Sequence, residues 1–173
     1  MNRFDIARQG LEFQRSRTLA LLDKVAQEPD PKAALGFRPG PGRAPLVWQL
    51  LHIAVTEELF ATERLVPGTT VRQPELVARF RGGSVPDDET PALEDVRCEL
   101  AESRARLLAT LSTFREDQLG WIPPALAQRG LTLDAVLHLL NWHEAHHQGQ
   151  AHLTFNLYQA SRAASGSPEA PRS

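Results

Sequence analysis

Residues 142–150, WHEAHHQGQ, place three histidines and a glutamate within five consecutive positions. His143, Glu144 and His147 fit the pattern H-E-x-x-H, in which two histidines one helical turn apart bind zinc and the glutamate acts as general base. The segment therefore raises three alternatives: a zinc protease, another kind of metal site, or a chance cluster on an ordinary helix.

The protease alternative requires a third metal ligand further along the chain. The extended motif H-E-x-x-H-x-x-G-x-x-H would require glycine at position 150 and histidine at position 153. This chain has Gly149 and His152, each one residue too early. Because an α-helix turns by about 100° per residue, such a shift removes a side chain from the site. A glutamate on a following helix also fails, since the only acidic residue after Glu144 is Glu169, in a Gly/Pro/Ser-rich tail. The protease interpretation is therefore disfavoured.

Helical periodicity indicates which of these histidines face inward. The apolar stripe of the last helix passes through Leu133, Val136 and Leu140. Continued in alternating steps of three and four residues, it reaches His143 and His147. A polar group in a bundle core is costly unless it is bonded, so both imidazoles need partners. His146 lies on a neighbouring face, and the remaining two are expected to project towards solvent: His138 and His152.

A third inward histidine comes from an earlier helix. Its stripe passes through Trp48, His52, Val55 and Leu59. An i, i+4 histidine pair fixes two neighbouring coordination positions, and a histidine on a facing helix supplies the third, which leaves an open position. Periodicity leaves two interpretations open: a metal site, or three hydrogen-bonded core histidines.

Four segments carry the periodicity of amphipathic helices, and none has the alternation of a strand. They cover approximately residues 2–27, 45–66, 90–114 and 132–161. A long connection at 66–90, with a short helix expected at 74–80, joins the second to the third. We expect an all-α fold, a four-helix bundle with one long crossover connection, as a single domain over 1–162. Residues 163–173 have the composition of a disordered tail.

Composition narrows the function classes. The 173 residues suffice for one domain, and the net charge of −2 offers no basic surface to nucleic acid or an anionic membrane. No segment resembles a signal peptide or a membrane span. The single cysteine, Cys98, excludes an intrachain disulfide and is expected to be a small buried residue. We predict a cytoplasmic protein that binds neither nucleic acid nor membrane.

Two windows resemble the DinB/YfiT-like superfamily: WHEAHHQGQAHLTFNLYQ in the last helix and PLVWQLLHIAVTEELF in the second. The H-x-x-H-H-x-G-Q part of the first window is the more specific. Members often have arginine before the Gly-Gln pair, where this chain has Gln148. The resemblance implies a four-helix bundle, commonly a homodimer, that holds a divalent metal through three histidines.

Carried over to this sequence, the ligands implied by the resemblance are His52, His143 and His147, the same three that helical periodicity selects. Imidazole suits zinc, nickel, iron and copper alike, so the ligands do not choose the metal. Relatives resemble thiol-dependent S-transferases and a thiol-dependent isomerase that use low-molecular-weight thiols such as bacillithiol or mycothiol. The resemblance thus adds a thiol as cosubstrate.

We therefore expect a divalent-metal-binding protein that is a metal-dependent hydrolase or a thiol S-transferase. A thiol at the open position would lose its proton, whereas bound water would have a lowered pKa. Two other hypotheses are a non-catalytic metal- or ligand-binding stress-response protein and a purely structural bundle. Metal stoichiometry separates the structural bundle from the others, and turnover separates the enzyme from the binding protein.

Two further residues are candidates for supporting the site. Glu144 and Gln150 lie near the inner face, where each could hydrogen-bond a metal ligand, and Glu144 could accept a proton. Glu144 could equally form an ion pair at the rim of the bundle. A homodimer is expected to use the neighbouring face of the last helix, formed by Leu139, Trp142, His146 and Leu153.

Overall fold

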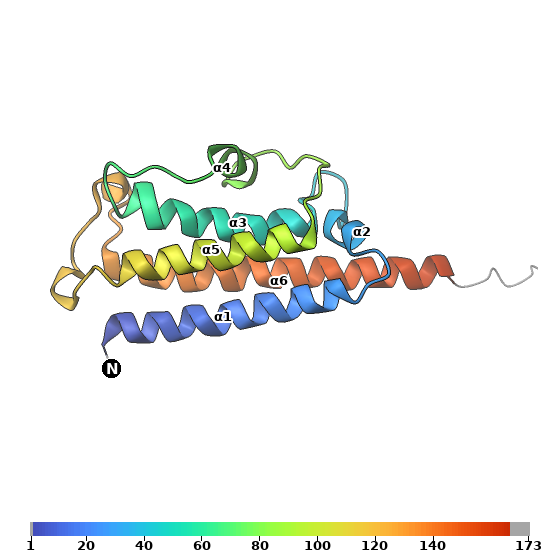
Figure 1. Cartoon of the computed structure of the whole chain (residues 1–173), viewed down its shortest axis with the longest axis horizontal. Helices are drawn as coiled ribbons and strands as arrows, with labels where there is room; N and C mark the ends of the chain where they lie inside the picture. Colours follow the sequence, from blue (N-terminus) through green and yellow to red (C-terminus); the bar gives the residue numbers. More distant parts are fainter. Residues whose placement is uncertain (1, 167–173) are drawn as a thin grey trace, which may run out of the picture.

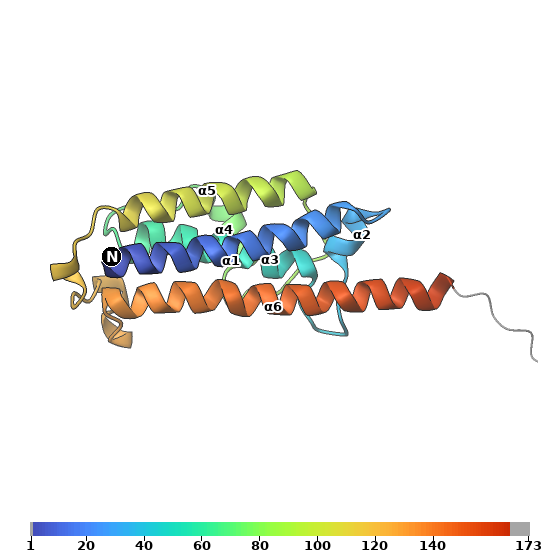
Figure 2. The ribbon, with the colours of Figure 1, turned by 90° about the horizontal axis from the view of Figure 1, so that it is seen from below.

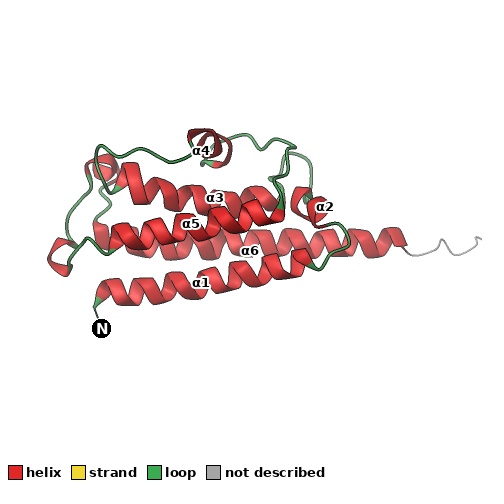
Figure 3. Cartoon of the chain, viewed as in Figure 1, coloured by secondary structure: helices red, strands yellow, loops and turns green. Residues whose placement is uncertain are grey.

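The computed structural model describes residues 2–166, and all regular structure in that range is helical (Figures 1 and 3). Four long helices form the bundle: α1 (Arg3–Ala26), α3 (Leu46–Leu59), α5 (Leu93–Leu111) and α6 (Leu133–Gly166). The predicted all-α four-helix fold is confirmed. Within the described part of the chain, no helix combines the length and apolar character needed to cross a membrane.

The long helices lie side by side, with α1 and α6 running in one direction and α3 and α5 in the other (Figures 1 and 2). In the bundle α6 packs between α1 and α3, and α5 packs against α3 and α1. Because α3 and α5 are parallel, the chain must return along the bundle between them. The predicted long crossover is this return, and it carries the short helix α4 (Pro74–Phe80) at the predicted position.

The ends of α1 and α6 follow local capping rules. The Asn2 side chain accepts the Asp5 N–H at 2.8 Å, and the Asp5 carboxylate accepts the Asn2 N–H at 3.3 Å, which makes a capping box. The Thr132 hydroxyl accepts the Ala135 N–H at 3.2 Å where α6 begins. At its other end α6 continues to Gly166, so residues 163–166 extend the helix, contrary to the expected disorder. The rest of the expected tail, 167–173, lies outside the described residues.

Several short helices were not expected from the sequence. Helix α2 (Pro31–Gly36) lies in the Pro/Gly-rich stretch, where the Asp30 side chain accepts the Ala33 N–H at 2.9 Å and Pro31 occupies the first turn. The last part of the predicted helix 45–66 is a π-helix, η1 (Phe60–Arg64), which extends α3 directly and has Thr62 at non-helical backbone angles. Two 3₁₀ helices, η2 (Glu116–Gln118) and η3 (Pro124–Arg129), lie between α5 and α6.

Apolar side chains fill the bundle in two clusters, one towards each end. The cluster nearest α2 and α4 includes Leu50, Phe80 and Phe155, and the other includes Leu11, Phe60 and Leu137. Cys98 is not part of either, since its thiol is exposed, so the expected burial was wrong. Cys98 lies two residues from both Val96 and Leu100, which belong to the buried stripe of α5. Its side chain is therefore turned by about 200° from theirs, away from the core.

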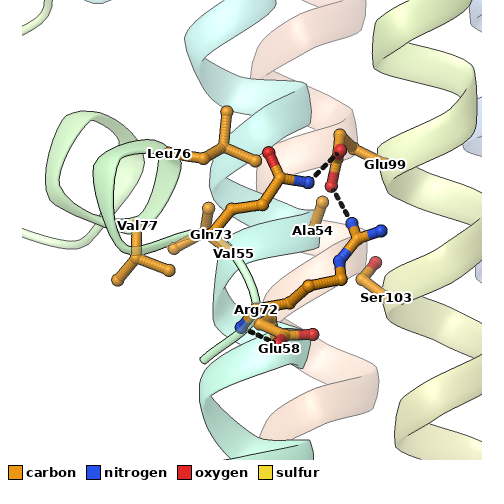
Figure 4. A pocket seen from close by; sticks show the side chains of 9 residues that line it. All are labelled: Ala54, Val55, Glu58, Arg72, Gln73, Leu76, Val77, Glu99 and Ser103. Atoms are coloured by element: carbon orange, nitrogen blue, oxygen red, sulfur yellow. Dashed lines mark hydrogen bonds and ion pairs between the residues drawn. The ribbon is translucent and has the colours of Figure 1, made fainter. Parts of the chain in front are cut away.

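The crossover is fastened to the bundle by polar contacts at its start (Figure 4). The Arg72 backbone N–H donates to Glu58 at 2.8 Å, and its guanidinium pairs with Glu99 at 2.7 Å. The Gln73 side chain also donates to Glu99, at 2.5 Å. Since Glu58 lies on α3 and Glu99 on α5, these contacts fix the approach to α4, and α4 in turn covers part of the candidate site.

Candidate metal centre

The structure brings the three predicted histidines together. His52 comes from α3, and His143 and His147 come from α6, which runs antiparallel to it. One ring nitrogen of each lies within 4.8 Å of those of the other two. His52 is buried, whereas His143 and His147 are half-buried, so the group lies near the edge of the core rather than at its centre.

His52 is held on both sides by α3 and the end of α4. Its Nδ1 lies 2.6 Å from the Phe80 carbonyl oxygen, and because a carbonyl only accepts, Nδ1 carries the proton. The Trp48 indole stacks on the ring at 4.6 Å between centroids and 11° between planes, and is itself held by a 3.2 Å hydrogen bond to Ser84. With Nδ1 protonated, the lone pair of neutral His52 is on Nε2, which faces His143.

The two histidines of α6 are oriented by side chains of α3. His147 Nδ1 lies 2.7 Å from the Gln49 amide oxygen, so it donates there and leaves its lone pair on Nε2. His143 Nε2 lies 3.1 Å from His52 Nε2 and 3.3 Å from the Thr56 hydroxyl. Hydrogen bonds at Nδ1 thus prepare two of the imidazoles to bind through Nε2, as outer hydrogen bonds do at histidine metal sites.

The donor set and its spacing fit a divalent metal ion. In a tetrahedral site with metal–nitrogen bonds of about 2.0–2.1 Å, ligand nitrogens lie about 3.3 Å apart. The 3.1 Å separation of the His52 and His143 Nε2 atoms is close to that distance. Three imidazoles leave a coordination position open, which is the arrangement of catalytic rather than structural zinc sites.

The electrostatics of the group keep its imidazoles neutral. Burial, with smaller contributions from the neighbouring histidines, lowers the pKa of both His143 and His147 to about 3. Burial also lowers the pKa of His52, while the hydrogen bond to Phe80 opposes the change and the positive charge of Arg64 adds to it. Since only the neutral imidazole has a lone pair to donate, this environment favours metal binding.

Glu144 lies in a different part of the bundle from its neighbour His143. It is 1% exposed, and its carboxylate accepts hydrogen bonds from Arg15 and Thr18, each at 2.8 Å, and from Arg104. This excludes a rim ion pair, and none of its described contacts is with the three imidazoles. Both oxygens are committed to buried cations, which leaves no free oxygen to accept a proton or orient a ligand.

Gln150 lies apart from the three histidines, whereas His146 lies beside one of them, 5.0 Å from His147 between ring centroids. Gln150 is exposed, and its amide contacts His146 Nε2 at 2.7 Å. His146 stacks on Trp142 at 4.9 Å between ring centroids. His138 is exposed, as predicted, and lies near Arg3 and Asp134, whereas His152 is half-buried. The support expected from Gln150 is therefore not observed.

Sequence reasoning missed the residues that do support the site. Gln49 and Thr56 lie one turn to either side of His52, at spacings of three and four residues, and this periodicity was the available signal. The Phe80 carbonyl had no comparable signal, because any backbone carbonyl can accept a hydrogen bond and only the path of the crossover brings this one to His52.

Residues 10–151 match the family model of the DinB superfamily. The chain belongs to the DinB superfamily. The match includes all three histidines of the candidate metal centre, and the cluster fits a metal-binding DinB-like protein. No curated protein and no solved structure matches the chain. The family assignment therefore rests on the family model, whereas the geometry of the centre comes from the structure.

Proposed function

We propose that the protein is a metal-dependent enzyme whose divalent ion is held by the Nε2 atoms of His52, His143 and His147. The observation that carries this proposal is the convergence of three neutral imidazole nitrogens within 4.8 Å. Hydrogen bonds from two of the rings to Phe80 and Gln49 support it, because they direct Nε2 inward. Zinc, nickel or iron would suit these ligands.

The reaction class proposed is transfer of a low-molecular-weight thiol to an electrophile or, with water in its place, hydrolysis. A metal held here supplies Lewis-acid chemistry, lowering the pKa of a thiol or water at its open position. The residues of this chain orient the metal ligands: Gln49 and the Phe80 carbonyl hold two rings in place, and Trp48 stacks on His52. The Thr56 hydroxyl lies 3.3 Å from His143 Nε2 and can donate a hydrogen bond at the site.

Elemental analysis of untagged protein tests the metal site. We expect close to one equivalent of divalent metal per chain after loading, and close to none in His52→Ala and His147→Ala. His152→Ala is the matched control, because it removes an imidazole from the same helix outside the cluster, and it should bind metal normally. Less than one tenth of an equivalent in the unmutated protein after loading with zinc, nickel and iron would overturn the proposal.

Turnover tests the enzymatic part separately. Metal-loaded protein is mixed with a thiol and an electrophile such as 1-chloro-2,4-dinitrobenzene, and with activated esters and amides without thiol. Metal-dependent product formation that is lost in His147→Ala supports catalysis. Full metal binding without turnover of either substrate class, including tests with bacillithiol and mycothiol, would favour a non-catalytic binding protein instead.

The proposal includes a homodimer formed through an exposed apolar face of α6. Trp142 is 58% exposed and Leu153 61%, and Leu157 and His146 are also exposed. Large apolar side chains gathered on one face are typical of interfaces. Light scattering at micromolar concentration should give twice the mass of the chain, and Trp142→Glu with Leu153→Glu should give a monomer. A monomer in the unmutated protein would remove this part of the proposal.

A further inference from the structure

Arg64 lies in the π-helix η1, which extends α3 beyond His52 and Thr56 of the candidate metal centre. The Arg64 guanidinium lies over the Phe60 ring, 4.6 Å from its centroid. Arg64 also ends the π-helix η1, a type of irregularity found frequently at functional sites.

Two other arginines approach from separate segments. Arg81 directly follows Phe80, whose carbonyl holds His52, and it precedes Gly82, where an added Cβ would lie only 3.7 Å from the His52 ring. Arg129 ends η3, which packs against η1. The charges of Arg129 and Arg81 reach Arg64: burial and then these two charges lower its pKa, against the opposing charge of Glu63.

These three arginines are short of counter-charges. Within residues 2–166 none of them has an ion pair or a side-chain hydrogen bond, whereas neighbouring arginines such as Arg72 and Arg79 pair with carboxylates of the chain. Arg64 is half-buried, and its charge also reaches His52 and His143. Positive charge is thus gathered beside a group of neutral imidazoles, and among the described charges that act on Arg64 only that of Glu63 opposes it.

We propose that Arg64, Arg81 and Arg129 form an oxyanion-binding group beside the metal centre, which receives a carboxylate or phosphate of the substrate. Guanidinium groups suit both anions, because their fork of N–H donors matches two oxygens at once. A reactant held there by its anionic end would present its reacting end to the three histidines. This inference rests on the proposed function for the identity of the reaction, but not for the binding of the anion itself.

Isothermal titration calorimetry at low ionic strength tests the inference on metal-free and metal-loaded protein. The probes are inorganic phosphate and succinate, and on loaded protein also 3-mercaptopropionate against 2-mercaptoethanol, which share a thiol but differ in the carboxylate. We expect saturable binding of at least one simple anion to metal-free protein. Tighter binding of phosphate or of succinate shows which of the two anions the group prefers. Tighter binding of 3-mercaptopropionate than of 2-mercaptoethanol would place the anion on the thiol reactant.

The variants are Arg64→Gln, Arg81→Gln and Arg129→Gln, with Arg17→Gln as control. Arg17 is exposed on α1 and has no ion pair in the described chain, so its removal changes the net charge equally without touching the site. Each site variant should weaken anion binding about tenfold, which is about 1.4 kcal/mol, because it removes one charged hydrogen-bond donor. Arg81 and Arg129 are exposed, so their variants remain informative if Arg64→Gln does not fold.

Absence of saturable binding of phosphate and succinate would overturn the inference, as would equal affinities in the site variants and Arg17→Gln. Failure of the proposed function has a different signature. Metal binding without anion binding removes the oxyanion group only. Anion binding without metal binding leaves the oxyanion group in place and removes the metal centre.

Discussion

Two polar clusters lie inside this bundle, and they are built in opposite ways. The first, the ionic cluster, takes one charged residue from each long helix: Arg15, Glu57, Arg104 and Glu144. The second, the histidine cluster, takes neutral side chains from α3 and α6 only. In the ionic cluster the charges compensate one another, whereas in the histidine cluster uncharged ring nitrogens converge within 4.8 Å of one another.

The ionic cluster is nearly complete in itself. The Glu57 carboxylate accepts from Arg15 and from Arg104, each at 2.9 Å, and also from Ser103 at 3.0 Å. Among the described buried side-chain atoms, only Nη1 of Arg104 lacks a hydrogen-bond partner. A buried polar network with its partners in place favours one arrangement of the helices. Because Arg15 and Arg104 each pair with Glu57 on α3 and with Glu144 on α6, the ionic cluster favours one register of the two helices that carry the histidines.

The largest effect should follow from opening the ionic cluster. Glu144→Ala leaves two buried guanidinium groups without one of their counter-charges, and breaking such a pair typically costs about 3–5 kcal/mol. The free energy of unfolding, measured in urea, should fall by that amount. Glu12→Ala, which removes an exposed carboxylate from α1, should change it by less than about 0.5 kcal/mol. A similarly small loss of unfolding free energy in Glu144→Ala and Glu12→Ala would contradict the stabilising role of the ionic cluster.

Metal should stabilise the histidine cluster and leave the ionic cluster unaffected. At a metal concentration about 100 times the dissociation constant, the free energy of unfolding should rise by about 2.7 kcal/mol. His147→Ala should lose this increase because it removes one of three ligands, whereas His152→Ala should keep it. Urea unfolding with and without metal measures both. An undiminished increase in His147→Ala would show that metal binds elsewhere.

Gln49→Leu tests how the histidine cluster is supported without removing one of its three metal ligands. The substitution deletes the acceptor for His147 Nδ1, and the loss of such outer hydrogen bonds weakens metal binding by about 10- to 100-fold. Competition with a chelator measures the affinity. Gln150→Leu serves as control, because Gln150 contacts His146 rather than the cluster, and it should bind metal as the unmutated protein does. Equal affinities in the two variants would contradict the role of Gln49.

The smallest effect per residue concerns pH and the metal-free protein. The unfolded chain has histidines of pKa about 6.5, whereas His143 and His147 in the folded protein have a pKa of about 3. Between those values the unfolded state binds more protons, so lowering the pH destabilises the fold. From pH 7.5 to 5.5 each of the two histidines should account for about 1.4 kcal/mol of lost stability.

Urea unfolding in the presence of a chelator measures this pH dependence. His143→Gln should reduce the loss of stability between the two pH values by about 1.4 kcal/mol, because it removes one of the two groups whose pKa is about 3. His138→Gln removes an exposed histidine and should leave the loss unchanged. The same pH dependence in His143→Gln as in the unmutated protein would show that His143 is not held neutral by the fold.

The sequence determined the four long helices and the inward histidines, because both follow from periodicity within a single helix. Steps of three and four residues from Leu140 reach His143 and His147, and the same rule selects His52 on α3. The crossover and α4 were also predictable, since Pro and Gly mark where helices end. Cys98 obeys the same rule, because it lies off the stripe formed by Val96 and Leu100 on α5 and is exposed.

Only the tertiary structure decided which side chains complete each cluster. Glu144 follows His143 directly, yet a turn of about 100° sends it to Arg15 and Arg104, on helices distant in sequence. The Phe80 carbonyl and the three arginines beside the site likewise come from segments whose meeting depends on the path of the crossover and of η3. Periodicity fixes the direction of a side chain from its own helix, whereas packing between helices decides what it meets.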